Sequence, residues 1–158
     1  MKLRPIIPCL WYDTQAKDAA DLYVSLFPNS EITRINYYPD EGKDIHGKDA
    51  GTVLMVAFTL DGNKFTAMNG GPDFKFNESI SFQVLCDNQQ EIDHYWNNLT
   101  ANGGRESACG WLKDRFGLSW QIVPSNMGEL MSDPARAKRV MHAFMQMKKL
   151  DMNVLENA

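Results

Sequence analysis

The sequence has no apolar run near the roughly 20 residues that a membrane-spanning helix needs, although 44% of its 158 residues are hydrophobic. It also has no C-x-x-C pair. Its cysteines, Cys9, Cys86 and Cys109, are odd in number and far apart, which argues against a disulfide framework or a zinc knuckle. We therefore expect reduced, mostly buried thiols. Residues 1–5 carry charge but precede no signal-like apolar stretch, so we expect a soluble, cytoplasmic protein.

Basic charge is scarce as well. The formal net charge is −4, and the only local cluster of Lys and Arg lies near the C-terminus, at 138–139 and 148–149. Binding to a phosphate backbone generally needs a basic field, so nucleic acid is not an expected partner. A chain of this length can bury a core as one domain.

Apolar periodicity predicts the elements of the first half. Residues 6–12 form a strand-like run, and residues 15–27 repeat apolar side chains at helical spacing until Pro28. A strand at 30–38 and a polar loop at 39–50 follow. Strands at 52–60 and 64–68 flank Asp61-Gly62, which is the strongest hairpin signal in the chain.

The same order of elements is predicted a second time. Residues 80–86, 111–115 and 118–123 have strand patterns, and a helix at 88–102 ends at Gly103-Gly104. A shift of 73 positions places Ile7, Ala19, Tyr23 and Leu26 on Ile80, Ile92, Trp96 and Leu99. This repeat indicates two modules, each with one helix on a small sheet, and chance agreement among apolar residues is the alternative.

The C-terminal region differs from both modules. Ser132, Asp133 and Pro134 supply a helix cap and a first-turn proline. The helix that follows places Ala137, Val140, Met141 and Phe144, with Met145 or Met147, on one stripe. Such a stripe is typical of a core or dimer contact rather than a cofactor site.

Several stretches carry a resemblance to a known family. They lie at 20–28, 68–72, 80–82, 109–124 and 145–151, and the run from Trp111-Leu112-Lys113-Asp114 through Val123-Pro124 is the most specific. On these residues the sequence resembles the PhnB-like branch of the vicinal-oxygen-chelate (glyoxalase/bleomycin resistance/dioxygenase) superfamily, over nearly the whole chain.

The resemblance implies an α+β fold of two βαβββ modules whose curved sheets enclose a cleft, assembled as a homodimer. It implies a single domain over residues 1–158, with module 1 at 3–72, module 2 at 78–124 and a helical tail at 125–158. Members of this branch often bear the name 3-demethylubiquinone-9 3-methyltransferase. S-adenosylmethionine usually needs a glycine-rich turn between a strand and a helix, and no G-x-G-x-G turn occurs here.

Metal-dependent members of the superfamily carry His and Glu ligands on the first and last strands of each module. The resemblance places these positions on Ile7 or Pro8, Ala67 or Asn69, Ser81 and Gln121. None is a His, Cys, Asp or Glu, and a divalent cation needs three or four such donors, so we expect neither a family-type metal site nor a cofactor. The histidines, His46, His94 and His142, are expected at the surface or in packing.

Strand alternation predicts which side chains line the cleft. A helix is expected to cover one side of these strands, formed by Ile80, Phe82 and Val84 and by Leu118, Trp120 and Ile122. The alternate residues then face the cleft, namely Ser81, Gln83 and Leu85 on one strand and Ser119, Gln121 and Val123 on the other. Phe65, Ala67 and Asn69 share one side of the hairpin strand, and Asn69 is taken as part of the cleft wall. Such walls suit a small, largely neutral organic ligand. Alternatively, the amides bond only to one another or to water.

Cys109, Trp111 and Lys113 would share one face of a continuous strand. A thiol near an ammonium group is favoured as the nucleophilic thiolate. The favoured alternative is a turn formed by Lys113 and Asp114, with Cys109 buried. The candidate ligand-binding residues are therefore Asn69, Ser81, Gln83, Cys109, Trp111, Lys113, Ser119 and Gln121.

Three main functions are compatible with these patterns. The first is a protein or enzyme that binds a small organic metabolite in the cleft without metal. The second is a metal-dependent lyase, isomerase or dioxygenase of the superfamily, and the third is the 3-demethylubiquinone-9 3-methyltransferase of the family name. A purely structural dimer is a further alternative. The sequence leaves open whether a reaction is catalysed.

Overall fold

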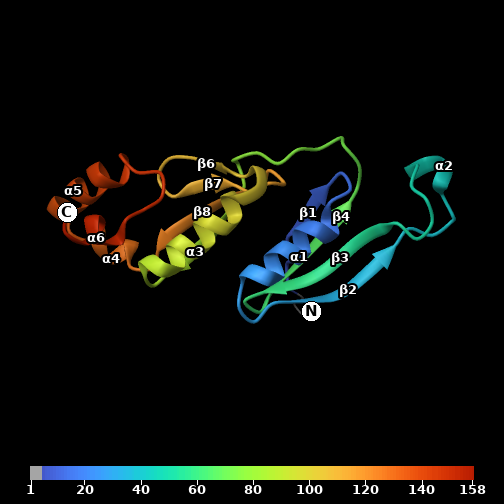
Figure 1. The fold of residues 1–158 in the computed structure, drawn as a ribbon, viewed down its shortest axis with the longest axis horizontal. Coiled ribbons are helices and arrows are strands. Elements are labelled where there is room, and N and C mark those ends of the chain that lie inside the picture. Colours follow the sequence, from blue (N-terminus) through green and yellow to red (C-terminus); the bar gives the residue numbers. More distant parts are fainter. Residues whose placement is uncertain (1–4) are drawn as a thin grey trace. The chain divides into compact units, whose positions relative to one another are not determined.

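The fold is that of a computed structural model, in which residues 5–158 are described. The chain forms two compact units that meet in sequence between Lys75 and Phe76 (Figure 1). Each unit contains a mixed four-stranded sheet, so the predicted α+β class is confirmed. The predicted start of module 1, at residue 3, lies outside the described residues. That both units belong to one domain stays a prediction.

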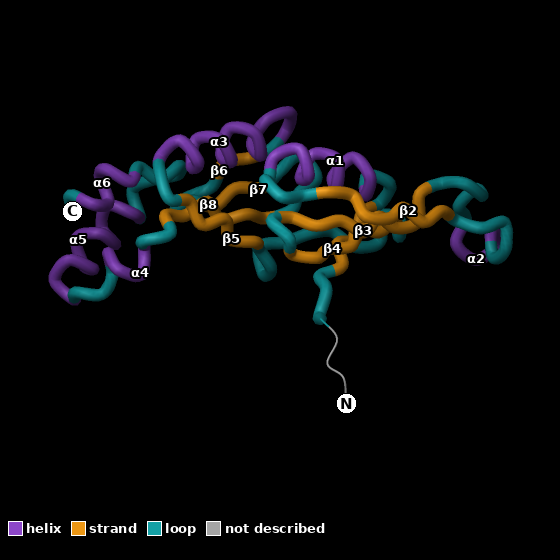
Figure 2. The backbone as a smooth tube through the Cα atoms, turned by 90° about the horizontal axis from the view of Figure 1, so that it is seen from below, coloured by secondary structure: helices purple, strands orange, loops and turns teal. Residues whose placement is uncertain are grey.

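The first unit is built on the sheet order β1-β4-β3-β2. Its elements are β1 (Cys9–Tyr12), α1 (Ala16–Leu26), β2 (Glu31–Tyr37), α2 (Lys43–His46), β3 (Val53–Leu60) and β4 (Asn63–Asn69). β1 and β4 are parallel, and the other neighbours are antiparallel. α1 lies over one face of this sheet (Figure 2) and buries Ala16, Ala19, Ala20 and Tyr23. The helical spacing of these residues in the sequence is thus the spacing of one buried stripe.

The predicted hairpin is confirmed at Asp61-Gly62. Leu60 pairs with Asn63, which leaves a two-residue turn between β3 and β4. Asp61 and Gly62 have φ values of 46° and 73°, as a type I′ turn requires, and the twist of that turn matches the twist of the strands.

The segment predicted as a loop at 39–50 contains the one-turn helix α2, so that part of the prediction is wrong. Gly42 and Gly47 flank α2 with φ values of 81° and 66°. The ring of His46 lies 4.6 Å from the ring of Tyr38, and Lys43 forms an ion pair with Asp49 at 2.7 Å. A single turn held by such side-chain contacts is too short to give a periodic signal.

The second unit repeats the topology in the order β5-β8-β7-β6. Its elements are β5 (Phe82–Cys86), α3 (Gln89–Thr100), the 3₁₀ turn η1 (Ala101–Gly103), β6 (Arg105–Glu106), β7 (Trp111–Lys113) and β8 (Ser119–Pro124). β5 and β8 are parallel, and β6, β7 and β8 are antiparallel. β6 was not predicted, because two residues show no alternation. α3 covers one face of the sheet (Figure 2).

The repeat in the sequence corresponds to this repeated topology. Ala19 and Ile92 are both fully buried on the helix of their unit, and Tyr23 and Trp96 are buried one turn later. Ile7 and Ile80, also paired by the shift of 73, both precede their strands and are 40% and 68% exposed. The expected burial of Ile80 under the helix is therefore wrong.

The tail consists of the helices α4 (Met127–Leu130), α5 (Pro134–Phe144) and α6 (Met152–Glu156). The predicted start of α5 is confirmed, because the Asp133 carboxylate caps it and accepts from the Arg136 amide. The core of the tail consists of Leu130, Val140, Leu150 and Leu155. Met141, predicted on the buried stripe, is 40% exposed, and Ala143 packs on the core instead.

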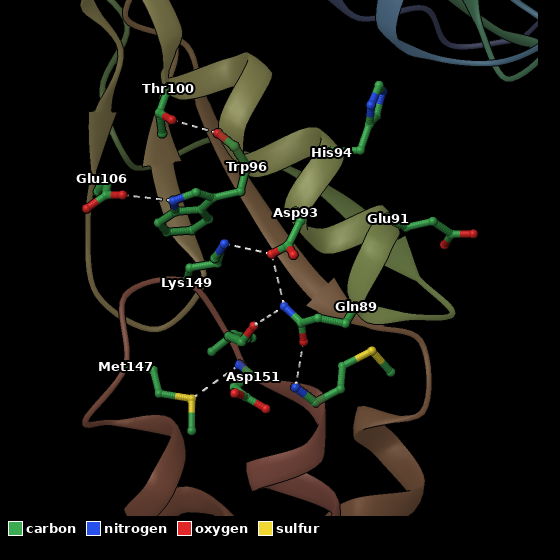
Figure 3. Close-up of polar contacts among 12 residues, drawn as sticks. Gln89, Glu91, Asp93, His94, Trp96, Thr100, Glu106, Met147, Lys149 and Asp151 are labelled. Carbon is green, nitrogen blue, oxygen red and sulfur yellow. Dashed lines mark hydrogen bonds and ion pairs between the residues drawn. The ribbon is translucent and has the colours of Figure 1, made fainter.

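The tail is fastened to α3 through Gln89 (Figure 3). Its side-chain amide donates to the carbonyl of Leu150 at 3.1 Å and accepts from the amide of Met152 at 2.9 Å. Lys149 adds an ion pair of 2.6 Å with Asp93. The segment before α6 is thus held against the helix that covers the second sheet.

No helix within residues 5–158 is both long enough and apolar enough to cross a bilayer.

Candidate functional site

The face of the second sheet opposite α3, called here the far face, collects most of the predicted site residues. Leu112, Trp120 and Ile122 are almost fully buried beneath α3. Alternation then turns Gln83 and Leu85 on β5, Trp111 and Lys113 on β7, and Ser119, Gln121 and Val123 on β8 to the far face. Of the eight predicted residues, six come together here: Ser81, Gln83, Trp111, Lys113, Ser119 and Gln121.

A chain of amide and hydroxyl groups crosses the far face. Gln83 and Gln121 are direct partners in the parallel register, and the Gln83 side chain donates to Oε1 of Gln121 at 3.2 Å. The Gln121 side chain donates in turn to Oγ of Ser81 at 2.8 Å. Trp111 is paired with Gln121 on the other side, so an indole ring borders this chain. The side-chain amides of Gln83 and Gln121 therefore bond to each other, which was the alternative to ligand binding that the sequence left open.

Lys113 is the charged member of the set. Its ammonium group lies 2.6 Å from a carboxylate oxygen of Glu78, and the two side chains are 32% and 64% exposed. The hydrogen bond from Lys113 holds the pKa of Glu78 below its ordinary value. The predicted turn involves Asp114 alone, because its carboxylate accepts from the Phe116 amide at 2.9 Å.

Ser119 is the least satisfied polar residue of the far face. The residue is 1% exposed, and its Oγ has no hydrogen-bond partner among residues 5–158. A buried hydroxyl without a partner costs about 1–3 kcal/mol, so each such group in a native fold calls for an explanation, such as a bound water or ligand.

Asn69 does not lie with these residues, and its expected place in the cleft wall is wrong. It is 7% exposed, and its Oδ1 accepts from the amide of Ala16 at the start of α1. Its Nδ2 donates to the carbonyl of Val53, and its own carbonyl accepts from the Tyr38 hydroxyl. Gln15, the residue before α1, makes no capping hydrogen bond with its side chain. Asn69 on β4 supplies an acceptor for the first turn of α1 instead.

Cys109 also departs from the prediction. Its φ of 59° places it in a turn in which the Trp111 amide donates to the carbonyl of Ala108, so β7 begins only at Trp111. Its own amide donates to the carbonyl of Met147 at 2.7 Å. The expected common face of Cys109, Trp111 and Lys113 is therefore wrong, and the thiol is half-buried rather than buried.

The fold and these faces can be compared with known proteins. The family model for 3-demethylubiquinone-9 3-methyltransferase matches residues 4–123. The chain belongs to this family.

Solved structures agree with this assignment. A PhnB protein from Bacillus cereus is 30% identical, with 76% of this chain and 99% of that chain covered at a TM-score of 0.67. Protein PA1353 from Pseudomonas aeruginosa is 18% identical, with 77% and 98% covered at 0.58. The fosfomycin resistance protein FosX from Listeria monocytogenes is 16% identical, with 82% and 98% covered at 0.53. The fold is thus the glyoxalase type predicted. A comparison with curated proteins finds no match.

The residues that the resemblance places at the metal positions do not fit a divalent cation. Ala67 and Asn69 face α1, and Ser81 and Gln121 offer only a hydroxyl and an amide already bonded to each other. Within residues 5–158, no group of three or more His, Cys, Asp or Glu side chains could hold a metal ion. A cation of this kind prefers imidazole, carboxylate or thiolate donors.

Sequence reasoning missed Trp11 in the first unit. It alternates with the buried Leu10 and Tyr12, so it lies on the sheet face away from α1. Its indole nitrogen donates to the carbonyl of Gly71 at 2.9 Å, and the ring of Phe74 meets it edge-on at 5.0 Å. The available signal was the Gly70-Gly71 pair, because any Cβ at Gly70 would collide with the indole.

Proposed function

We propose that this protein binds a small organic metabolite on the far face of the second sheet, without the metal site of its metal-dependent relatives. The observation that carries the proposal is the buried hydroxyl of Ser119, which lacks a partner among the described residues and lies beside the Ser81–Gln121–Gln83 chain. A ligand carbonyl or hydroxyl bonded to Ser119 would remove the cost of that unpaired group. The indole of Trp111 would supply apolar contact.

The test is a thermal-shift screen of metabolites, followed by calorimetry on the hits. A ligand that binds only the folded state must raise the melting temperature. Gln121→Ala removes the centre of the polar chain and should weaken binding about tenfold, the effect of about 1.4 kcal/mol. Gln146→Ala is the matched control, since Gln146 is exposed in the tail and its side chain makes no hydrogen bond to residues 5–158. Equal affinities of the two variants would contradict the proposed site.

Two other activities have tests of their own. Micromolar binding of S-adenosylmethionine in calorimetry would favour the methyltransferase activity that the family name describes. Stoichiometric zinc, nickel, manganese or iron in protein purified without chelator would favour a metal-dependent lyase, isomerase or dioxygenase. The donor groups described above support neither as well as they support metal-free binding.

The proposal includes a homodimer in the cytoplasm, with neither nucleic acid nor a membrane as partner. The dimer is expected from the family resemblance. In such a reducing compartment the three cysteines would stay free thiols. Only Cys86 is buried, so the expected burial of the thiols is wrong for Cys9, which is exposed. Light scattering at tens of micromolar protein should give twice the mass of the chain, and a monomer would contradict the dimer.

A further inference from the structure

We propose that the ligand of the far face carries an oxyanion, such as a carboxylate or a phosphate, which binds Lys113 in place of Glu78. This inference rests on the proposed function, because it takes the far face as the binding surface. It adds the chemical class of the ligand, which has an uncharged body and one anionic end.

The first support is a row of three directly paired residues across the sheet, Arg105, Lys113 and Ser119, of which the first two are cationic. Arg105 on β6 is the direct partner of Lys113 on β7, and Lys113 is the direct partner of Ser119 on β8. Directly paired residues project to the same face, with Cβ atoms about 4.5–5.5 Å apart. The neighbour of Arg105, Glu106, points to the α3 side, where its carboxylate accepts from the indole of Trp96. Arg105 therefore shares the far face with Lys113.

Two like charges in direct register repel each other and favour an anion between them. The structure places one anion beside Lys113, the carboxylate of Glu78 at 2.6 Å, and it forms no ion pair with Arg105. Arg105 is exposed and has no ion-pair partner within residues 5–158. The row thus holds two positive charges against one carboxylate.

The second support is the weakness of the Glu78 contact. Glu78 lies in the irregular segment before β5, and its side chain is 64% exposed. Exposed ion pairs contribute little, because solvent screens them and ordering two long side chains costs entropy. An anion supplied by a ligand can therefore replace Glu78 without a large loss of stability.

The third support is Ser119, the next residue in the row. Its buried hydroxyl has no acceptor among the described residues, and it stands beside Lys113 in register. An oxyanion on Lys113 would accept a hydrogen bond from this hydroxyl. Charge-assisted bonds of this kind are roughly twice as strong as neutral ones. A carboxylate or a phosphate offers the two or more oxygens that Lys113 and Ser119 need together.

The probes are inorganic phosphate and acetate, titrated separately at constant ionic strength and followed by the backbone amide resonances of Arg105, Lys113 and Ser119. We expect saturable shifts of these amides in the wild-type protein. Glu78→Gln should tighten the anion about two- to fivefold, because it removes the competing carboxylate. Lys113→Gln should abolish the shifts. Lys138→Gln, an exposed change in α5, is the matched control and should leave them unchanged.

The two anions separate a carboxylate ligand from a phosphate ligand, and saturation by either supports the proposal. Absence of saturable shifts, or weaker binding in Glu78→Gln, would overturn it, since Glu78 would then not compete. The proposed function fails by a different result, namely metabolite binding that Gln121→Ala leaves intact. A metabolite that depends on Gln121 but is insensitive to Lys113→Gln would uphold the proposed function and overturn the anionic ligand.

Discussion

Replacing Asp114 with alanine should destabilise the second unit more than any surface change. Asp114 is 3% exposed at the turn between β7 and β8. One carboxylate oxygen accepts from the amides of Phe116 and Leu118 at 2.9 and 3.1 Å, and the other accepts from the indole of Trp120 at 2.9 Å. These bonds set the register in which Lys113 stands opposite Ser119.

The size of the stability loss follows from the three donors that lose the Asp114 carboxylate as their acceptor in Asp114→Ala. A buried donor left without its partner costs about 1–3 kcal/mol. Phe116 is only half-buried, so its amide can reach water after the turn relaxes. We therefore expect a loss of about 3–5 kcal/mol in the free energy of unfolding. Asp114→Asn keeps one acceptor oxygen and should lose less, about 1–3 kcal/mol.

The assay is urea unfolding followed by circular dichroism and by tryptophan fluorescence. Asp21→Ala is the control, because Asp21 forms an ion pair with Lys17 in which the side chains are 47% and 46% exposed. It should cost less than about 1 kcal/mol. If Asp114→Ala loses no more stability than Asp21→Ala, the hydrogen bonds at the turn do not have the value assigned here.

Three further predictions concern the backbone, the tail and a buried thiol. Gly110→Ala should lower the free energy of unfolding by about 2–4 kcal/mol in thermal unfolding, since φ is +78° and a Cβ would meet a backbone oxygen at 2.7 Å. Gly117→Ala is the control: φ is +88° but the space is open, so the loss should be only roughly 1 kcal/mol. Equal losses would contradict the steric argument. Gln89→Ala removes the acceptor of the Met152 amide, so hydrogen exchange of this amide should become about tenfold faster. An unchanged exchange rate would show that Gln89 does not hold the tail against α3. Burial raises the pKa of Cys86 from 9.0 to about 12, so the unfolded chain loses this proton first: stability should be full below pH 9 and fall from pH 9 to 12 by up to about 1.4 kcal/mol per pH unit. Urea unfolding at several pH values checks this, and Cys86→Ala should make the slope shallower; an unchanged slope would contradict the role of the buried thiol. Lys17 and Lys43, whose pKa values are raised by their ion pairs, keep part of the slope in both proteins.

Local chemistry made much of the fold predictable. The buried stripe of α1, the Asp61-Gly62 turn and the Asp133 cap each depend on residues within a few positions of one another. The same holds for the far face, because alternation along β5 and β8 assigns Gln83 and Gln121 to one side whatever the strands pair with. Alternation could therefore assign four of the eight predicted site residues to one face, namely Ser81, Gln83, Ser119 and Gln121. The side taken by Trp111 and Lys113 was decided by strand pairing.

Contacts between distant segments decided the rest. Asn69 caps α1 across 53 positions of sequence, and the turn at Cys109 is tied to Met147 by a backbone hydrogen bond. Neither contact leaves a periodic trace along the chain. The register that aligns Arg105, Lys113 and Ser119 is likewise a property of strand pairing, which depends on where each strand begins and ends. The sequence by itself determined the longer helices and strands and the polar character of one sheet face, because these depend on periodicity along the chain. Only the tertiary structure decided which charges and hydroxyls lie side by side on that face, because their pairing depends on strand register.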